Sequence, residues 1–500
     1  MPVVEIREID GPLVVCSVAA ADAAEATRAL NAAPAGCSLV ELRADRLRPD
    51  ETASLVRGAG RPLIVTIRRR ENGGGFDGSE EERRQALCGA LEAGARFVDV
   101  EWDGALASLA DDRAYRSRVI LSQHGVACRA DELLSLYRRM RDRPGIPLKI
   151  VASAASASQL PALRRLLGQA VSESRRLSAF ALGRAGALSR LMAPAWGSWA
   201  TYGALERGAE TAPGQYAAKE MLELYDVLRV TPDTRRFALA GTGVGGSPSP
   251  AMHAAGYREA GIDARYFAVE VDTLDELMPL LDPKDGVGFD GLAVTMPFKE
   301  DAASRCAERD ELSTACGAVN TVVVESGRWR GYNTDGPGAL ARIRKRLDPA
   351  GRRAAVLGAG GTARAMAAAL VGAGAGVTLF NRTVDRARRA AALTGADWAP
   401  LENLAGFPWD ILLHATPRGR DGERFFDPGW LRGGLVLDAV YGPRPTALVD
   451  DARHRGLEVI DGLELLAAQA APQFRLMTGQ DAAFDLLHAA GIQWISPRSS

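Results

Sequence analysis

The chain has 500 residues, more than one hydrophobic core usually serves, so we expect at least two domains. Apolar residues make up 47% and charged residues 25% of the sequence, which is ordinary for a globular protein. The formal net charge of −1 leaves no basic surplus that would favour nucleic acid and no acidic surplus that would form a solvating tail.

The N-terminal segment, residues 1–10, carries acidic residues and no long apolar run, so we expect no signal peptide. The sequence has no unbroken apolar stretch of roughly 18 residues, the length that a membrane helix needs. The cysteines are scattered without a CxxC pair, which predicts a reducing cytoplasm and no zinc site. They are Cys16, Cys37, Cys88, Cys128, Cys306 and Cys316.

Arginine supplies nearly all of the positive charge, because the chain contains only five lysines. Arginine cannot form an imine or lose its proton near neutral pH, so each lysine in such a composition is a candidate for a reactive amine. The lysines are Lys149, Lys219, Lys284, Lys299 and Lys345.

Short apolar runs alternate with helix-like stretches through the first half of the chain. The runs lie at residues 13–19, 39–45, 63–68, 97–102, 118–124, 147–152, 177–183 and 199–205. Strands that alternate with helices predict a parallel sheet, and eight such units are what a closed (β/α)8 TIM barrel requires. An open doubly wound sheet is the alternative, and the count of eight favours the barrel.

The second half follows an expected amphipathic helix over residues 217–230 and a polar, proline-containing linker over 231–236. It divides into one βα set and a nucleotide-binding unit, and it ends in a helical tail from 461. We therefore expect an α/β chain of four parts. They are a barrel (1–232), a substrate-binding domain (233–338), a Rossmann-like domain (339–460) and a helical segment that returns to the substrate domain (461–500).

Polar residues stand at the ends of several predicted barrel strands, where barrel enzymes place their chemistry. Lys149 lies inside an apolar run, and an amine that loses its proton through desolvation becomes a nucleophile towards ketones. The alternative is a lysine that pairs with a glutamate or extends to the barrel mouth. His124 alone would be a structural histidine, but beside an imine-forming amine it can remove a proton next to the imine carbon.

The first half resembles the type I 3-dehydroquinate dehydratases over about residues 1–230. The motifs occur in the order and spacing of that family: ELR (41–43), TIR (66–68), SQH (122–124), LKI (148–150), LSRL (188–191) and TAPGQ (211–215). The resemblance implies that Lys149 forms an imine with the C3 ketone of 3-dehydroquinate. It implies that His124 abstracts a C2 proton and protonates the departing C1 hydroxyl, which gives 3-dehydroshikimate.

The same resemblance implies a substrate site. Arg190 would clamp the substrate carboxylate, a bidentate task that suits a planar guanidinium. Ring hydroxyls and the carboxylate would be held by Glu41, Arg43, Arg68, Thr211 and Gln215.

One departure from this family concerns the residue that orients the histidine. The family places a glutamate shortly after the TxR motif, whereas Asn72 stands at that spacing here, one residue after Glu71. Either Glu71 serves through a one-residue shift, or Asn72 orients His124 without a charge. The second case would weaken the imidazole as a base.

The segment AAVLGAGGTAR (354–364) carries a G-x-G-x-x-A pattern between a predicted strand and a predicted helix. Such a turn brings backbone N–H groups to a pyrophosphate at the helix N-terminus. The next strand ends in arginines where NAD-binding proteins carry an acid for the ribose 2′-hydroxyl, so we expect NADP(H). The alternative is that these arginines are merely exposed. The expected cofactor residues are Gly358, Ala359, Gly360, Gly361, Thr362, Ala363, Asn381, Arg382, Thr383 and Arg386.

The second half resembles shikimate dehydrogenase over nearly all of residues 237–490. The motifs are GSPSP (246–250), VTMPFK (294–299), GAVNT (317–321), YNTDG (332–336), GAGGTAR (358–364), NRT (381–383), HATPRG (414–419) and DGLELLAAQ (461–469). The resemblance implies NADPH-dependent reduction of 3-dehydroshikimate to shikimate, with Lys299 as general acid/base and Asp335 as its partner. The alternative for these two residues is a surface ion pair.

Further residues of this half acquire expected roles from the resemblance. Asn320 and Gln469 would bind ring hydroxyls, and the substrate carboxylate would be addressed by Ser247, Ser249, Thr295 and Tyr441. Two positions depart from the family. Ala293 stands where bacterial members have an asparagine, which would remove a hydroxyl contact, and His414 replaces the asparagine before the Ala-Thr pair near the cofactor.

Together the halves predict a bifunctional lyase and oxidoreductase of aromatic amino acid biosynthesis. It would act in the cytoplasm on small-molecule substrates as a monomer or homodimer, without nucleic acid, membrane or metal. One alternative is a quinate/shikimate dehydrogenase that uses NAD. The other is a sensor or scaffold in which a site binds without turnover, which the altered Glu71–Asn72 region would support.

Overall fold

The computed structural model describes residues 11–496; residues 497–500 and the N-terminal segment Met1–Asp10, where no signal peptide is expected, lie outside the described residues. The chain forms two compact units. One contains the chain up to Thr234 together with Asp275–Gly288, and the other contains Arg235–Leu274 and the chain from Phe289 onward. Among the described helices, none combines the length and apolar character needed to cross a membrane.

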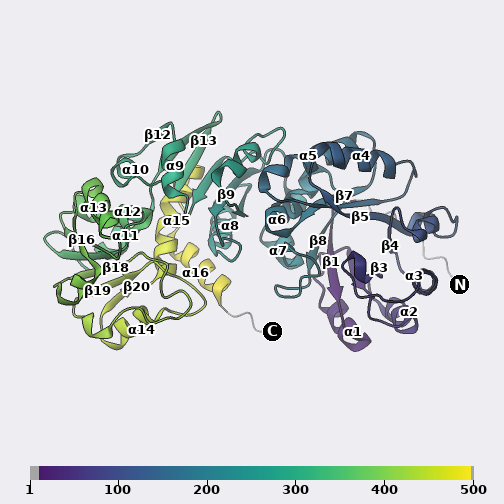
Figure 1. Cartoon of the computed structure of the whole chain (residues 1–500), viewed down its shortest axis with the longest axis horizontal. Coiled ribbons are helices and arrows are strands. Elements are labelled where there is room, and N and C mark those ends of the chain that lie inside the picture. The colour runs from purple at the N-terminus through teal and green to yellow at the C-terminus, as the bar shows by residue number, and fades with distance from the viewer. Residues whose placement is uncertain (1–10, 497–500) are drawn as a thin grey trace. The chain divides into compact units, whose positions relative to one another are not determined.

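Eight parallel strands form the first unit, in the order β7-β6-β5-β4-β3-β2-β1-β8 (Figure 1). They are β1 (Leu13–Ala19), β2 (Leu39–Arg43), β3 (Leu63–Thr66), β4 (Phe97–Glu101), β5 (Val119–Ala127), β6 (Leu148–Ser153), β7 (Leu177–Leu182) and β8 (Ala200–Ala204). Parallel ladders join each neighbouring pair in this order. β7 contacts β8 without a ladder between their described residues, so the barrel is nearly closed. The predicted eight-stranded barrel is confirmed.

Helices alternate with these strands. They are α1 (Ala23–Ala32), α2 (Pro49–Gly58), α3 (Glu80–Ala93), α4 (Ala130–Met140), α5 (Pro161–Ser172), α6 (Gly183–Met192) and α7 (Ala218–Glu223). The short 3-10 helices are η1 (Arg70–Asn72), η2 (Ala105–Ala110), η3 (Arg116–Arg118), η4 (Ala157–Gln159), η5 (Pro194–Trp196) and η6 (Val227–Arg229). Between β4 and β5, η2 and η3 take the place of an α-helix.

The helix expected over residues 217–230 is wrong in length. α7 ends at Glu223, and η6 follows only after Asp226. Asp226 has a φ of 44°, and this left-handed conformation cannot continue a right-handed helix.

The interior of the barrel has an apolar layer below a polar layer, because residues two apart on a strand face the same side. Four consecutive strands contribute to one buried apolar cluster through Leu39, Ile64, Phe97 and Ile120. Two positions further along the same strands stand four buried polar residues: Glu41, Thr66, Asp99 and Ser122. This polar layer is where the first candidate site lies.

The second unit contains two six-stranded sheets. The first, in the order β10-β9-β11-β13-β14-β12, consists of β9 (Arg235–Gly241), β10 (Ala264–Glu270), β11 (Gly291–Val294), β12 (Glu308–Arg309), β13 (Thr321–Glu325) and β14 (Arg328–Tyr332). The helices of this part are α8 (Ser249–Ala260), α9 (Lys299–Arg305), α10 (Glu311–Cys316) and α11 (Asp335–Arg344). Between β10 and β11 lies η7 (Leu274–Leu280), which apart from Leu274 belongs to the first unit. Arg235 and Arg236, expected in a linker, belong to β9, because they pair with the start of β10.

The tail is helical, as expected from residue 461. It forms α15 (Gly462–Thr478) and α16 (Phe484–Ile495), which pack against α8; α15 also packs against α11. Phe474 in α15 and Tyr257 in α8 place their ring centroids 5.2 Å apart. The C-terminal segment therefore returns to the first sheet of this unit.

The second sheet has the order β17-β16-β15-β18-β19-β20 (Figure 1). Its strands are β15 (Arg353–Leu357), β16 (Gly376–Asn381), β17 (Asp397–Pro400), β18 (Ile411–His414), β19 (Leu435–Asp438) and β20 (Glu458–Ile460). The helices are α12 (Gly361–Gly372), α13 (Val384–Thr394) and α14 (Ala447–His454), with η8 (Leu401–Gly406) and η9 (Pro428–Trp430). This is the doubly wound order, with its switch point between β15 and β18, so the predicted Rossmann-like domain is confirmed.

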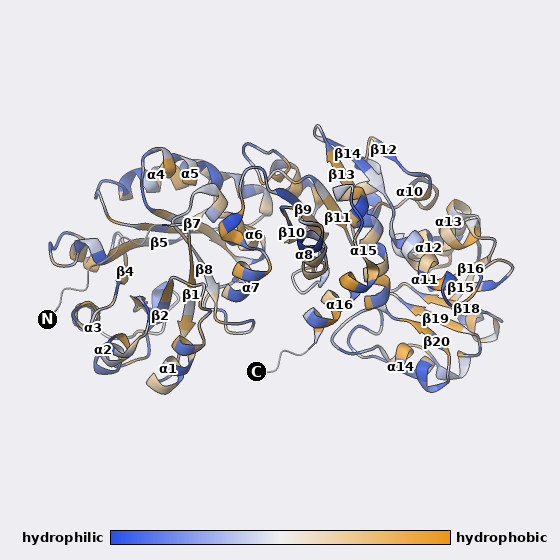
Figure 2. Ribbon diagram, turned by 180° about the vertical axis from the view of Figure 1, so that it is seen from behind, coloured by the Kyte–Doolittle hydropathy of each residue, from blue (hydrophilic) through white to orange (hydrophobic). Residues whose placement is uncertain are grey.

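Apolar residues concentrate in the strands of the barrel and of this doubly wound sheet, whereas the helices mix apolar and polar residues (Figure 2). Separate buried clusters cover the two faces of the doubly wound sheet. The carboxyl ends of the parallel strands carry the polar groups described next.

Candidate active sites

Lys149 lies in β6 at the level of the polar layer, and only 4% of the residue is exposed. Its Nζ atom is 3.2 Å from Glu41 Oε1 and 3.0 Å from Asp99 Oδ2. The ring centroid of Tyr202 lies 4.0 Å from the same atom. A buried charge requires such partners. The pairing with a glutamate that the sequence left open is therefore present, and it fixes the amine inside the barrel.

The two carboxylates are themselves held by hydroxyl groups. Ser17 donates to Glu41 Oε2 over 2.7 Å, and Thr66 donates to Glu41 Oε1 over 2.9 Å. Ser122 donates to Asp99 Oδ1 over 2.6 Å. Burial raises the pKa of Glu41 and of Asp99, but the nearby positive charges, Lys149 foremost, and the hydroxyl hydrogen bonds together outweigh it, so the pKa of each lies below its usual range. Both groups therefore remain carboxylates at neutral pH.

Asp99, Ser122 and Tyr202 were not predicted from the sequence as site residues. An acid in the middle of the apolar run 97–102 was the available signal for Asp99, because a buried acid needs a cationic partner. The serine and the tyrosine carry no such signal on their own.

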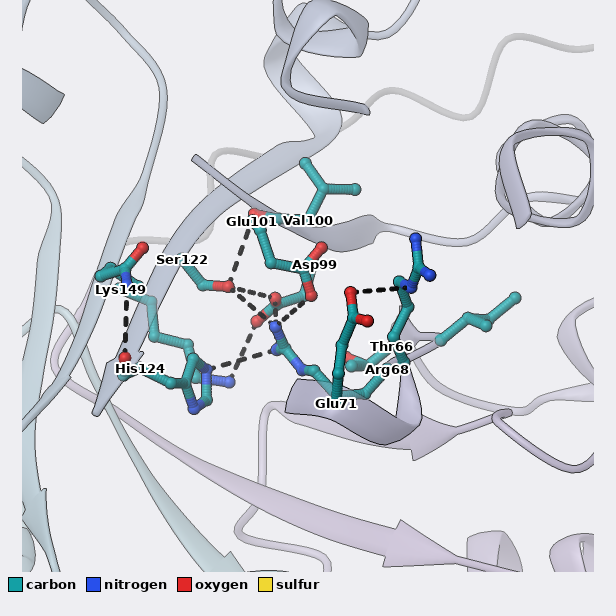
Figure 3. A network of polar contacts seen from close by, with 12 residues as sticks. Thr66, Arg68, Glu71, Asp99, Val100, Glu101, Ser122, His124 and Lys149 are labelled. Atoms are coloured by element: carbon teal, nitrogen blue, oxygen red, sulfur yellow. Dashed lines mark hydrogen bonds and ion pairs between the residues drawn. The ribbon is translucent and has the colours of Figure 1, made fainter. Parts of the chain in front are cut away.

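Arg68 joins the carboxylates to His124 (Figure 3). Its guanidinium lies 2.8 Å from Asp99 Oδ1 and 2.7 Å from Glu101 Oε1. Arg68 Nη2 lies 3.3 Å from His124 Nε2. Since a guanidinium can only donate, this contact requires Nε2 to be the acceptor of a neutral imidazole.

His124 ends the regular part of β5, where the register with β6 shifts at Gly125, whose φ is 77°. Such a bulge redirects the side chain beside it. Burial lowers the pKa of His124, and the charges of Arg68 and Lys149 lower it further, to well below 6.5. The imidazole is therefore neutral at physiological pH, which is the form in which it can act as a base.

Neither residue considered for orienting His124 does so in the described part of the chain. Glu71 has a side chain that is 65% exposed and pairs with Arg69 over 3.1 Å. Asn72 is exposed at the end of η1. Figure 3 shows Glu71 on the opposite side of Arg68 from His124. The contact with His124 comes instead from Arg68.

Arg190 is the candidate carboxylate clamp of the barrel. It is 1% exposed, its Nη1 atom donates to the backbone oxygen of Tyr202 over 3.2 Å, and its Nε and Nη2 atoms have no partner among the described residues. Burial lowers the pKa of Arg190 below its usual range. Two unsatisfied donors on a buried cation leave room for an anionic ligand.

The remaining expected residues of the barrel occupy two other places. Arg43 pairs with Asp45 over 2.7 Å. Gln215 Oε1 accepts hydrogen bonds from the Thr211 backbone over 2.8 Å and from its hydroxyl over 3.2 Å. The structure brings Thr211 and Gln215 together, and in the described residues it shows no contact between them and Lys149.

In the second unit, Lys299 and Asp335 begin α9 and α11 respectively. Lys299 Nζ lies 2.5 Å from Asp335 Oδ2 and 2.8 Å from Thr362 Oγ1. Asn320 Nδ2 donates to Asp335 Oδ1 over 2.8 Å. The side chains of Lys299 and Asp335 are only 13% and 10% exposed, so the alternative of a surface ion pair is wrong.

The expected hydroxyl-binding residues lie beside this pair. Asn320 Nδ2 is 3.3 Å from Gln469 Oε1, and both side chains contact the hydroxyl of Thr334. Ser247 and Ser249 share a hydrogen bond of 3.1 Å at the start of α8. Thr295 lines the adjoining cavity. The structure therefore gathers Asn320 and Gln469 around Asp335.

The other positions of interest in this unit lie elsewhere. Tyr441 packs against the apolar cluster that contains Met252 and Leu463. Ala293, one of the two departures from the family, belongs to the buried apolar cluster around Phe237.

A cavity of about 1110 Å³ adjoins Lys299 at the carboxyl ends of β15, β16 and β18. All of the expected cofactor residues line this cavity except Ala363. Ala363 is buried in an apolar cluster between α12 and the doubly wound sheet. Gly358 has a φ of 118°, and Gly360 is the N-cap residue of α12 and provides no side-chain cap, so the N–H groups of the first turn can bind an anion.

Positive charge lies at the end of this cavity that is formed by β16 and α13. Arg382, Arg386 and Arg389 line it there. Arg418 also lines the cavity, but from the loop after β18 rather than from β16 or α13. Arg389 and Arg418 were not predicted from the sequence, although Arg389 lies one helical turn after Arg386. The glycine turn, the size of the cavity and the arginines together fit a phosphorylated dinucleotide.

Comparison with known proteins gives two matching families. Residues 14–232 match the family described as type I 3-dehydroquinase, and residues 239–322 match the shikimate dehydrogenase substrate binding domain. The chain is 29% identical over 519 residues to the chloroplastic bifunctional 3-dehydroquinate dehydratase/shikimate dehydrogenase of Arabidopsis thaliana, which covers 96% of this chain and 84% of that one.

Other relatives each match about half of this chain, and they include an enzyme and a solved structure. The shikimate dehydrogenase (NADP(+)) of Moorella thermoacetica is 40% identical over 272 residues, covering 51% of this chain and 92% of that one. The solved structure of shikimate 5-dehydrogenase from Thermus thermophilus, in complex with NADP(H) and shikimate, is 35% identical. It covers 52% of this chain and 99% of that one, with a TM-score of 0.48.

Replacing Asp99 by Asn should destabilise the first unit, because it leaves Lys149 and Arg68 each short of a buried carboxylate. We expect a loss of about 3–5 kcal/mol in the free energy of unfolding at pH 7, measured by urea denaturation. The pKa of Asp99 is lowered on folding, so its contribution is present above the pKa of the unfolded chain and is lost as pH falls below about 4.

The matched control is Asp103→Asn, at an exposed position just after β4. It should change the free energy of unfolding by no more than about 0.5 kcal/mol. Equal stabilities of the two variants at pH 7 would show that the buried ion pairs contribute nothing.

Proposed function

The chain belongs to the shikimate dehydrogenase family and carries a type I 3-dehydroquinase region before it, and from this we propose that it catalyses two successive reactions. The first is the dehydration of 3-dehydroquinate to 3-dehydroshikimate, and the second is the NADPH-dependent reduction of 3-dehydroshikimate to shikimate. One observation carries the proposal: two primary amines, Lys149 and Lys299, are each held by carboxylates in separate units. Tethering the two sites raises the local concentration of the shared intermediate.

In the dehydratase reaction, Lys149 would first give its ammonium proton to the neutral imidazole of His124, and the free amine would attack the C3 ketone. His124 would then return the proton to the carbinolamine oxygen, which leaves as water, so that a protonated imine and a neutral imidazole remain. Glu41 and Asp99, which hold the amine at 3.2 and 3.0 Å, would stabilise the protonated imine by their negative charges. The iminium draws electrons from C2, and neutral His124 takes the C2 proton. The same imidazole then returns this proton to the C1 hydroxyl, which leaves as water, and hydrolysis frees Lys149.

Charged side chains of the barrel would bind the carboxylate and the ring hydroxyls of the substrate. Arg190, with two unsatisfied donors, would bind the substrate carboxylate in a bidentate manner. Glu41, Arg43 and Arg68 would meet the ring hydroxyls. The segment that carries Thr211 and Gln215 would complete the site.

In the dehydrogenase reaction, NADPH supplies a hydride when it is bound. Lys299 donates a proton to the oxygen that becomes the new hydroxyl, and Asp335 and Thr362 hold the ammonium in place. Asn320 and Gln469 would bind the ring hydroxyls. The substrate carboxylate would be held by Ser247, Ser249, Thr295 and Tyr441.

The cofactor residues would divide by location. The turn from Gly358 to Thr362 would hold the pyrophosphate at the start of α12. Asn381, Arg382, Thr383 and Arg386 would bind the 2′-phosphate at the end of β16. Ala363 would act only through the packing of α12.

We further propose domain boundaries near residues 232, 338 and 460, as the sequence patterns indicate. The scattered cysteines support a cytoplasmic location. The balanced charge supports a protein without nucleic-acid or membrane partners. We propose that it acts as a monomer or homodimer.

A coupled assay tests the proposal: with 3-dehydroquinate, NADPH and no other enzyme, the protein should oxidise NADPH, which requires both reactions. Lys149→Ala should abolish NADPH oxidation from 3-dehydroquinate and leave oxidation from 3-dehydroshikimate intact. Lys299→Ala should lower kcat by about 10²–10⁴-fold with either substrate.

Borohydride with 3-dehydroquinate should add mass to the peptide that contains Lys149.

Lys219→Ala is the matched control, because this lysine is exposed and lies 3.9 Å from its nearest carboxylate. It should behave as the unmodified protein in each assay. Absence of NADPH oxidation from 3-dehydroquinate, or an adduct on a lysine other than Lys149, would contradict the proposal.

The pH dependence of dehydration should reflect the lowered pKa of His124. The base works in its neutral form, and a lowered pKa keeps that form populated as pH falls. We therefore expect the acid limb of kcat/KM for 3-dehydroquinate to lie below pH 6.5. If steady-state kinetics place the acid limb at or above pH 6.5, the pKa of His124 is not lowered, and the prediction is contradicted.

Arg382→Asp should discriminate between the cofactors. Loss of the charged contact should raise the KM for NADPH by about 10–100-fold and change that for NADH little. Arg388→Asp is the matched control, because Arg388 is exposed on α13, pairs with Asp385 and does not line the cavity. Equal effects of Arg382→Asp on both cofactors would favour an NAD-dependent enzyme.

A further inference from the structure

A buried His–Asp pair lies behind the dinucleotide cavity. His414 and Asp438 end the adjacent strands β18 and β19 at paired positions of the parallel register, and both are 0% exposed. His414 Nδ1 lies 2.8 Å from Asp438 Oδ1. This pair takes no part in the chemistry proposed above.

Asp438 is fully used as an acceptor. Besides His414, the Val440 backbone donates to Oδ1 over 3.0 Å, and the Thr446 hydroxyl donates to Oδ2 over 2.5 Å. Thr446 also caps the N-terminus of α14. Three donors around one buried carboxylate make Asp438 a fixed anchor, and they assign the proton on this side to His414 Nδ1.

The opposite edge of the imidazole reaches the cavity wall. His414 Nε2 lies 2.5 Å from Thr416 Oγ1, and Thr416 lines the cavity with its neighbours 415, 417 and 418. The ring of Phe425, which also lines the cavity, lies 4.4 Å from the imidazole, centroid to centroid. His414 thus links the buried carboxylate of Asp438 to the hydroxyl of Thr416, which lines the cavity.

This wall touches the glycine turn of the cofactor site. A Cβ atom on Gly358 would lie 3.0 Å from the Ala415 oxygen and 3.3 Å from Thr416 Cγ2. In a doubly wound sheet the pyrophosphate crosses at the first turn, with the 2′-phosphate end at the next strand, β16. The nicotinamide half of the cofactor therefore falls on the other side of the switch point, at β18 and its loop.

We propose that His414 is a positioning residue for the nicotinamide half of NADP(H): anchored on Asp438, it holds Thr416 and thereby fixes the loop 415–418 against the bound dinucleotide. The inference rests on the proposed function, since it concerns the same cofactor. An asparagine at 414 has a shorter side chain, so it keeps the bond to Asp438 and loses the one to Thr416. The imidazole is the longer, rigid bridge that satisfies both.

The test is the Kd of the full-length chain for NADPH and for NADH, measured by isothermal titration without substrate. Thr416→Val and His414→Asn should each raise both values by about two- to tenfold, the cost of one hydrogen bond. The ratio of the two Kd values should stay constant, because the 2′-phosphate lies at the other end of the cavity. Thr416→Ser, which keeps the hydroxyl, should bind as the unmodified protein does.

A double-mutant cycle separates positioning from general weakening. If His414 acts through Thr416, the double variant should bind no more weakly than the weaker single variant. Thr394→Val is the matched control, because it removes a buried hydroxyl of α13 that bonds to the Ala390 oxygen outside the proposed network. It should leave both Kd values unchanged.

Two results would overturn the inference: an unchanged Kd for Thr416→Val, or a double variant whose loss is the product of the two single losses. Failure of the proposed function has a different signature, because then the unmodified protein would bind neither nucleotide. Circular dichroism and thermal unfolding of the same preparations check that the second unit, which carries the substitutions, is folded in each variant.

Discussion

A charged amine inside a barrel must be paired, and much of the first unit follows from that constraint. Burying the ammonium of Lys149 without partners would cost several kcal/mol, so Glu41 and Asp99 accompany it. These carboxylates in turn need hydroxyl donors and a guanidinium, and Arg68 needs Glu101, which also contacts Arg83 of α3. The result is a connected polar layer next to the apolar layer of the barrel interior, and it fixes the position of Lys149 Nζ.

The same charges determine the state of the imidazole. A carboxylate beside His124 would raise its pKa, whereas the guanidinium of Arg68 lowers it. His124 is contacted by Arg68 rather than by an orienting carboxylate. This contact favours the neutral imidazole and makes it a weaker base. Glu71 is exposed, and Asn72 makes no contact with His124 among the described residues. Neither residue therefore raises the pKa of the imidazole.

The second unit uses a different arrangement for its amine. Lys299 has one carboxylate and one hydroxyl partner, and the hydroxyl, Thr362, belongs to the first turn of α12 beside the cofactor cavity. The proposed proton donor, Lys299, and the proposed phosphate-binding turn are thereby joined by a hydrogen bond. At another part of the same cavity wall, the hydrogen bonds from Asp438 through His414 to Thr416 hold the loop 415–418 in a similar way.

The sequence by itself determined the architecture, because short apolar runs that alternate with helix-like stretches, and the glycine turn that follows one of them, are local signals. It identified Lys149, His124, Lys299 and Asp335 as candidates, because lysine is rare in this chain and the flanking motifs are specific. It could not identify Asp99 or Arg389, or show that Arg68 rather than Glu71 or Asn72 meets His124. Nor could it give a role to His414. Those contacts join strands and helices far apart in the chain, and only the tertiary packing decides which buried charges and hydrogen-bonding groups become neighbours.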